Sequence, residues 1–279
     1  MRKSIGAIAR QWLTVVAVLM AIAVNALSNF FPPLGQNIGQ ISNTTLGGVL
    51  VTPDGYAFAI WGVIYIGLIA YSIYQALPAQ RTDSVCQQIS LALIGACVLQ
   101  MAWVLAFLLY QFWLSVALMF AIVGCLWVAY LRSRSVRPTR TRRWLLQSPI
   151  SVYFGWITVA AVVNVASAIY ATPVQDDPLL GQPYSLVTNE VFGLGAEVWT
   201  VILMIVSASI AARIAWRHSD AAYPAVTAWA LSAIAVRHSN DIAPVTIVGV
   251  AGAILLSVLI VRIVASGQGR PRPLDIASD

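Results

Sequence analysis

An all-α, polytopic membrane helical bundle is the fold class that this sequence predicts, and three observations predict it. The chain has 279 residues, of which 59% are hydrophobic and only 9% are charged, whereas about 25% of the residues of a soluble domain are charged. The mean hydropathy is +0.81. The apolar residues also gather into stretches that approach the roughly 20 residues a helix needs to cross a bilayer. We therefore predict an integral, multi-pass membrane protein.

Eight apolar stretches follow one another along the chain, and we expect each to form a transmembrane helix. They are 11–31, 55–77, 88–109, 112–131, 149–171, 194–216, 221–237 and 243–265. The seventh is the weakest because it is short and holds Pro224 near its start, although the first turn of a helix tolerates proline. The first could instead be a cleaved signal peptide, since it follows basic residues. Its continuation to Phe31 favours a retained helix.

The basic residues predict how these helices are oriented. Fifteen of the 16 lysine and arginine residues lie before the first span, around alternate loops after it, or at the end of the chain. Only Arg237 lies at an intervening loop. Because basic residues concentrate on the cytoplasmic side of a membrane, we expect both termini to be cytoplasmic.

Composition and motifs exclude several classes of function. The net charge of +6 is explained by cytoplasmic loops, so we expect no nucleic-acid partner. Lys3, the only lysine, lies outside the spans, which excludes the Schiff base of a retinal protein. The three cysteines lack metal-site spacing, and no phosphate-binding loop or nucleophile elbow occurs, so we expect neither a metal site nor an enzyme. Charged residues such as Asp220 fall at span ends, where we expect them to reach water.

Three of the predicted helices carry aromatic and amide side chains on one face. The candidate site residues are Phe58, Trp61 and Tyr65 in the second span, Gln100 and Trp103 in the third, and Tyr153, Trp156 and Asn164 in the fifth. Helical spacing places each set on one side of its helix. Such a lining can stack a flat apolar ligand and hydrogen-bond its edge. Plain helix packing, with the amides joining neighbouring helices, explains the same pattern, and both interpretations stay open.

Three short motifs carry a resemblance to a known family. The stretch YFGWITVAAVVNVA, 153–166, has the pattern Tyr-x-x-Trp-x-x-x-Ala-x-x-x-Asn; WGVIY, 61–65, has Trp and Tyr four residues apart; and QMAW, 100–103, ends in Trp. In these motifs the first 171 residues resemble the tryptophan-rich sensory protein family (TspO/MBR), also called the translocator protein or peripheral benzodiazepine receptor family. The resemblance implies a five-helix bundle over 1–171. The chain resembles a longer form of this family, in which residues 172–279 would add an external loop, three further membrane helices and a cytoplasmic tail.

The sequence departs from the family pattern at several positions. Ala59 and Ile60 stand where the family has a proline before the tryptophan of its second helix, and Gln100 replaces an asparagine. No lysine or arginine stands in the residues directly after Tyr170, so the cholesterol motif proposed for the end of the fifth helix is missing. Among the ligands that the resemblance implies, a sterol is therefore the least supported.

The resemblance implies a sensory or regulatory protein of a bacterial cell membrane that binds a flat hydrophobic ligand, such as a porphyrin, haem or similar tetrapyrrole. We expect the pocket between spans one, two, three and five, closed by residues 32–55. The expected partners are membrane lipid, this small molecule and a second copy of the chain as a homodimer. No other cofactor is expected. Two alternatives stay open: a small-molecule transporter whose extra helices complete a path, and a scaffold subunit of a larger membrane complex that binds no ligand.

Overall fold

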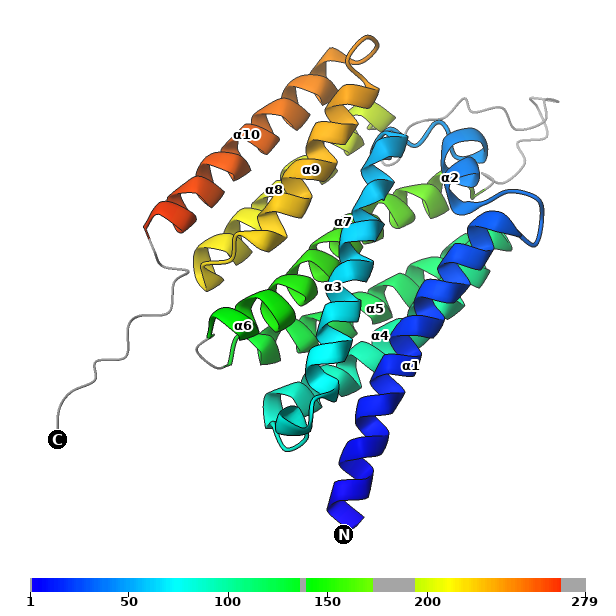
Figure 1. Ribbon diagram of the computed structural model, residues 1–279. Coiled ribbons are helices and arrows are strands. Elements are labelled where there is room, and N and C mark those ends of the chain that lie inside the picture. The colour runs from blue at the N-terminus through cyan, green and yellow to red at the C-terminus, as the bar shows by residue number, and fades with distance from the viewer. Residues whose placement is uncertain (1, 136–138, 173–193, 267–279) are drawn as a thin grey trace.

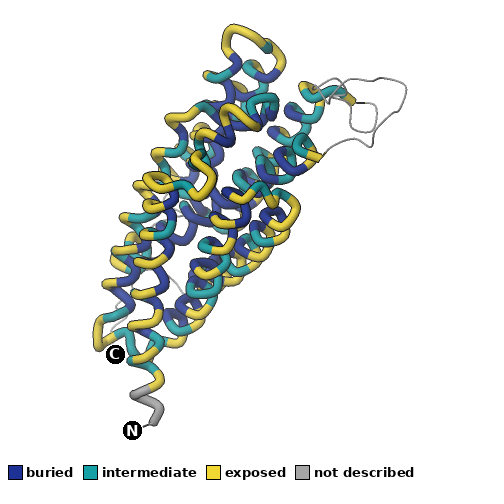
Figure 2. The backbone as a smooth tube through the Cα atoms, turned by 90° about the vertical axis from the view of Figure 1, so that its right-hand side faces the viewer, coloured by how far each residue is buried: buried dark blue, intermediate teal, exposed yellow. Residues whose placement is uncertain are grey.

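The protein is a bundle of long helices, as predicted (Figure 1). The computed structural model describes residues 2–135, 139–172 and 194–266, and no β-strand element occurs among them. Most of the external loop predicted after residue 171 and of the C-terminal tail lies outside these residues. Buried residues run along the inner sides of the helices and exposed residues cover the outside (Figure 2).

A helix occupies each of the eight predicted positions. The long helices are α1 (Arg2–Phe30), α3 (Ile60–Ala76), α4 (Ser84–Leu108), α5 (Phe112–Ser133), α7 (Ser148–Tyr170), α8 (Ala196–His218), α9 (Ala222–Arg237) and α10 (Ala243–Ala265). Short helical turns complete the described elements: α2 (Ile38–Gln40), η1 (Ile41–Thr45), η2 (Gly55–Ala59), η3 (Pro78–Gln80), α6 (Arg140–Arg142) and η4 (Arg143–Gln147).

Seven of the described helices are long and apolar enough to cross a membrane, and α9 is not among them. Its 16 residues span about 24 Å at about 1.5 Å per residue, less than a hydrocarbon core of about 30 Å. Ten of these 16 residues are buried, compared with five of the 23 residues of α10. The short helix is therefore covered mainly by protein.

Tight turns join several pairs of consecutive long helices, among them α4 with α5 and α8 with α9, into antiparallel hairpins. Asp83 caps α4, where its carboxylate accepts a hydrogen bond of 2.9 Å from the Cys86 amide. Among the described residues, two that are not glycine adopt the left-handed conformation at turns: Tyr110 between α4 and α5 (φ 59°) and Ser219 after α8 (φ 49°). This backbone conformation reverses the chain within a few residues, so consecutive helices lie side by side.

The first five long helices form a closed ring. Helix α1 packs on α3, α3 on α7, α7 on α5, α5 on α4, and α4 returns to α1. Glycines allow close approach within this ring: a Cβ atom at Gly67 would lie 3.1 Å from Pro149 of α7, and one at Gly95 would lie 3.2 Å from Cys125 of α5. At one end of the ring, Gln11 and Gln75 each donate a side-chain hydrogen bond to the other's backbone carbonyl, at 2.6 and 2.9 Å.

Helices α8, α9 and α10, which we call the C-terminal unit, pack against one another and against the ring. Helix α9 makes the main contact, with α7, where Gly155 lies close to the Tyr223 carbonyl. Within the unit, a Cβ atom at Gly249 of α10 would lie 2.8 Å from the Leu231 carbonyl oxygen of α9. Both contacts depend on the absence of a side chain at a glycine.

The described basic loops gather at one end of the bundle, which we call the basic end. It includes the start of α1, the loops before α4, α7 and α9, and the end of α10 (Figure 1). Arg142 forms an ion pair with Asp83 there. Burial raises the pKa of Asp83, but hydrogen bonding from the Cys86 amide and the Arg142 guanidinium lower it by more, so it lies below its ordinary value.

Candidate functional site

Four predicted site residues meet where α3, α4 and α7 converge, and we call them the aromatic cluster. Trp61 and Tyr65 of α3 lie with ring centroids 5.5 Å apart, and Trp61 meets Tyr153 of α7 edge-on at 6.3 Å. The Tyr153 hydroxyl donates to the side-chain oxygen of Gln100 of α4. Tyr153 and Gln100 are buried, whereas Trp61 and Tyr65 are half-buried. The predicted faces of three helices therefore point towards one another.

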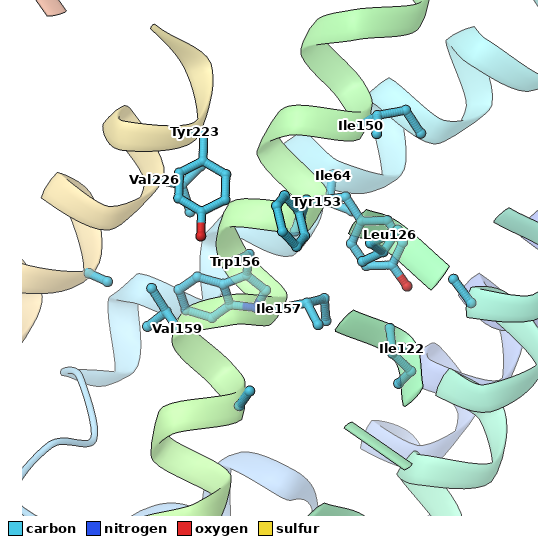
Figure 3. Close-up of a cluster of buried hydrophobic side chains, with 14 of the residues drawn as sticks. Ile64, Ile122, Leu126, Ile150, Tyr153, Trp156, Ile157, Val159, Tyr223 and Val226 are labelled. Atoms are coloured by element: carbon cyan, nitrogen blue, oxygen red, sulfur yellow. The ribbon is translucent and has the colours of Figure 1, made fainter. Parts of the chain in front are cut away.

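Phe58 and Trp156 extend the cluster towards the end of the bundle opposite the basic end. Their rings meet edge-on with centroids 6.0 Å apart. Trp156 lies among buried side chains of α7 and its neighbours, with Tyr153 beside it and Tyr223 of α9 on the other side (Figure 3). Edge-to-face pairs contribute about 0.5–1.5 kcal/mol beyond the burial of their area, so these rings are held in defined positions.

Trp103 and Asn164 form a separate hydrogen-bonded pair. The Trp103 indole N–H donates to the Asn164 side-chain oxygen at 2.8 Å, which joins α4 to α7. The Asn164 amide group donates in turn to the Ser115 hydroxyl of α5 at 2.8 Å. All three residues are buried. These polar groups satisfy one another, which favours the packing interpretation for Trp103 and Asn164.

The Tyr65 hydroxyl has no partner of this kind. Its oxygen is buried and makes no hydrogen bond to any of the described residues. A buried hydroxyl without a partner costs about 1–3 kcal/mol. It lies in the same cluster as the Trp61 and Tyr153 rings, so a polar group on a molecule stacked there could accept its hydrogen bond.

Residues 32–55, which we call the closing loop, cover the end of the ring opposite the basic end and are attached to α9. Arg237 donates to the Asn43 side-chain oxygen at 3.1 Å, and His238 donates from Nε2 to the Leu50 carbonyl at 2.9 Å. The Asp54 amide donates to the Ala233 carbonyl at 3.3 Å. Just beyond the loop, the Trp229 indole donates to the Ala57 carbonyl at 3.1 Å. The C-terminal unit therefore holds the loop in place.

These attachments were not predicted from the sequence. Arg237 is the one basic residue that breaks the alternation, and that exception was the available indication of a separate role. Its contacts to Asn43 and Gly47 join residues about 190 positions apart in the chain. A contact between residues so far apart in the chain cannot be predicted from the spacing of residues along the sequence.

A buried ion pair joins the ring to the C-terminal unit at the basic end. Arg134, which follows α5, lies 2.7 Å from the carboxylate of Asp220, which precedes α9. The Tyr130 hydroxyl also donates to this carboxylate, at 3.1 Å, and Arg134 donates to the Ser151 hydroxyl at 2.7 Å. Asp220 is only 3% exposed. The expectation that Asp220 reaches water was therefore wrong, because its carboxylate is enclosed where Arg134, the Tyr130 hydroxyl and the Ala222 amide bind it.

Two hollows are described, and the predicted site residues line neither. The first is a void of about 10 Å³ among α7, α8 and α9, bordered by Val51 of the closing loop. The second is a groove of about 470 Å³ between α1 and α3. The rings of the aromatic cluster contact one another, so a ligand stacked among them would have to move the half-buried rings of Trp61 and Phe58.

Comparison with known proteins supports the motif-based resemblance and extends it. The family model described as TSPO-like protein matches residues 11–262. The match runs past residue 171 through α8 and α9 and into α10, so it includes the additional helices that the motifs of the first 171 residues do not reach. Neither the curated proteins nor the solved structures contain a match. With most of its length matched and its long apolar helices packed as a bundle, the chain is a membrane protein that belongs to the TSPO-like family.

Proposed function

We propose that this protein is a membrane receptor of sensory or regulatory type that binds a flat hydrophobic ligand in the aromatic cluster. The ligand class is a porphyrin, haem or a similar tetrapyrrole. The observation that carries the proposal is the Tyr65 hydroxyl, which is buried without a partner among the described residues next to rings that can stack on a planar molecule. The protein acts by binding and not by catalysis.

The predicted site residues have two roles in this proposal. Phe58, Trp61, Tyr153 and Trp156 provide the stacking surfaces, Tyr65 donates a hydrogen bond to the ligand, and Gln100 positions Tyr153. Trp103 and Asn164 hold α4 against α7. Because the cluster is packed, the ligand enters when the closing loop moves away and the half-buried rings rotate.

We propose further that the basic end faces the cytoplasm of a bacterial cell. The described basic residues near Arg81, Arg134 and Arg217 support this orientation through the positive-inside rule. The closing loop then faces outwards and receives the ligand from outside the cell. Membrane lipid and a second copy of the chain are the other proposed partners.

Titration of the purified protein with protoporphyrin, followed by quenching of tryptophan fluorescence, tests the ligand proposal. Tyr65→Phe should weaken binding roughly 2- to 10-fold, the equivalent of one hydrogen bond of about 0.5–1.5 kcal/mol. It should leave the melting temperature unchanged or slightly higher, because the hydroxyl has no protein partner to lose.

Tyr71→Phe is the matched control on the same helix. The Tyr71 hydroxyl lies 3.1 Å from the Ser90 hydroxyl of α4, so this change should lower the melting temperature and leave porphyrin affinity unchanged. Equal porphyrin affinity in wild type and Tyr65→Phe would refute the role of Tyr65. Porphyrin-dependent flux into proteoliposomes would favour the transporter alternative, and absence of binding would favour the scaffold alternative.

A further inference from the structure

A groove on the outside of the ring forms a second candidate binding site, separate from the aromatic cluster. It has a volume of about 470 Å³ and lies between α1 and α3, where Trp12, Val15 and Leu19 face Ile69, Ser72 and Ala76. This volume is within the range of ligand sites, about 300–1,000 Å³. Trp12 is 63% exposed and Leu19 52% exposed, so the groove opens towards the surroundings of the bundle.

The elongated shape of the groove favours a linear hydrocarbon chain over a planar ring system as its ligand. The lining residues recur every three or four positions on both helices, so the groove runs along the helix axes. From Trp12 to Leu19 it follows α1 for about 10 Å at about 1.5 Å per residue. Its walls are aliphatic apart from Trp12 and Ser72. An acyl chain lying along the helices fits this form better than a planar ring system.

Two arginines that form no ion pair with any described residue, Arg10 and Arg81, lie where the groove reaches the basic end. Leu77 and Pro78 form this end of the groove. Arg81 follows, and its Nε atom donates to the Gln11 side-chain oxygen at 3.4 Å, next to Trp12 in the chain. Arg10 donates to the Arg81 carbonyl at 3.2 Å. Among the described residues neither arginine forms an ion pair, and Arg10 Nε has no hydrogen-bond partner.

Ser72 gives the wall of the groove one polar group. It is 4% exposed, and its hydroxyl has no hydrogen-bond partner among the described residues. It lies one turn of α3 before Ala76, and Ile73, Leu77 and Pro78 also line the groove between it and the basic end. In a glycerolipid the ester carbonyl is the polar group nearest the acyl chain, so it is the group that would meet Ser72 when the chain lies in the groove.

We propose that this groove binds one acyl chain of an anionic phospholipid from the leaflet at the basic end. The chain lies between α1 and α3, the ester carbonyl accepts a hydrogen bond from Ser72, and the phosphate lies beside Arg81. Arg10 adds a second positive charge behind Arg81. This site does not depend on the ligand proposed for the aromatic cluster.

Native mass spectrometry of the full chain, released from micelles containing phosphatidylglycerol or phosphatidylcholine, tests the proposal. The wild type should retain one phosphatidylglycerol and markedly less phosphatidylcholine. Ala76→Trp, which fills the groove from α3, should remove the adduct, and Val15→Phe should do the same from α1. Val63→Trp is the matched control, because Val63 is 55% exposed and lies outside the groove; it should keep the lipid.

Arg81→Gln should abolish the preference for phosphatidylglycerol, whereas Arg132→Gln at the same end of the bundle should not. The proposal is overturned if the wild type retains no lipid, if it retains both lipids equally, or if Val63→Trp loses the lipid as Ala76→Trp does. A dimer that Ala76→Trp dissociates would assign the groove to a second copy of the chain and would also overturn it.

Discussion

Helices approach closely at glycines in both the five-helix ring and the C-terminal unit, and the ring adds pairs of buried polar side chains that join its helices. In the ring, buried side chains hydrogen-bond between helices, as in the Gln11–Gln75 and Trp103–Asn164 pairs. In the C-terminal unit, α9 and α10 approach closely at Gly249, next to Leu231 and Ala235. Within a membrane both small residues and interhelical hydrogen bonds bring helices together. The ring thus positions polar groups, whereas the C-terminal unit supports the ring through closely packed apolar helices.

The two regions meet at both ends of the bundle, and the two contacts differ in kind. At the basic end a buried ion pair joins Arg134 to Asp220. At the opposite end α9 holds a loop through hydrogen bonds from Arg237 and His238. A buried charge pair fixes the position of two elements, while hydrogen bonds to an exposed loop can break and re-form. We therefore expect the first contact to govern stability and the second to govern access.

The largest effect is expected from Asp220→Ala. This change leaves the Arg134 guanidinium, which is 17% exposed, without its carboxylate, and breaking a buried pair on one side costs about 3 kcal/mol. The melting temperature in detergent should fall by several degrees, about 2–4 °C per kcal/mol for a chain of this size. Arg134→Met combined with Asp220→Ala should recover part of the loss. A melting temperature equal to that of the wild type would show that the pair does not hold the two regions together.

A smaller loss is expected from Gly249→Val within the C-terminal unit. The new side chain would meet the Leu231 carbonyl oxygen at 2.8 Å and the Ala235 Cβ atom at 2.9 Å, and overpacking of this kind costs about 1–3 kcal/mol. Gly124→Val in α5 is the matched control, since a Cβ atom there meets nothing within 4 Å. Thermal unfolding of both variants measures the difference. Equal melting temperatures would mean that α9 and α10 can separate at little cost.

A local effect is expected from Arg237→Ala. The change removes the hydrogen bonds to Asn43 and Gly47, each of which contributes about 0.5–1.5 kcal/mol. Amide hydrogen exchange in residues 41–57 should accelerate several-fold, while exchange in α4 and α5 stays unchanged. Arg213→Ala, in α8 near the basic end, should leave both regions unaffected. Unchanged exchange in 41–57 would show that α9 does not hold the closing loop.

The sequence predicted the helices well because each is encoded locally by a run of apolar residues. It also placed Trp61, Gln100 and Tyr153 on faces that meet, since the helical repeat fixes which residues share a side. A criterion based on the length needed to cross a membrane does not identify α9. This helix is short, and most of its residues are buried by its neighbours. The partners of Asp220, Arg237 and Asn164 depend on the order of helices around the ring, which no local pattern encodes.

The most direct test compares Trp61→Phe with Trp103→Phe in parallel porphyrin titrations and thermal melts. Trp61 belongs to the aromatic cluster, and its ring meets Tyr65 and Tyr153. Trp103 donates its indole N–H to Asn164. Trp61→Phe should weaken porphyrin binding several-fold at an unchanged melting temperature. Trp103→Phe should lower the melting temperature, because it leaves a buried acceptor unpaired at a cost of about 1–3 kcal/mol, and should keep wild-type affinity. Unchanged affinity in Trp61→Phe with a lowered melting temperature would contradict a ligand site in the aromatic cluster.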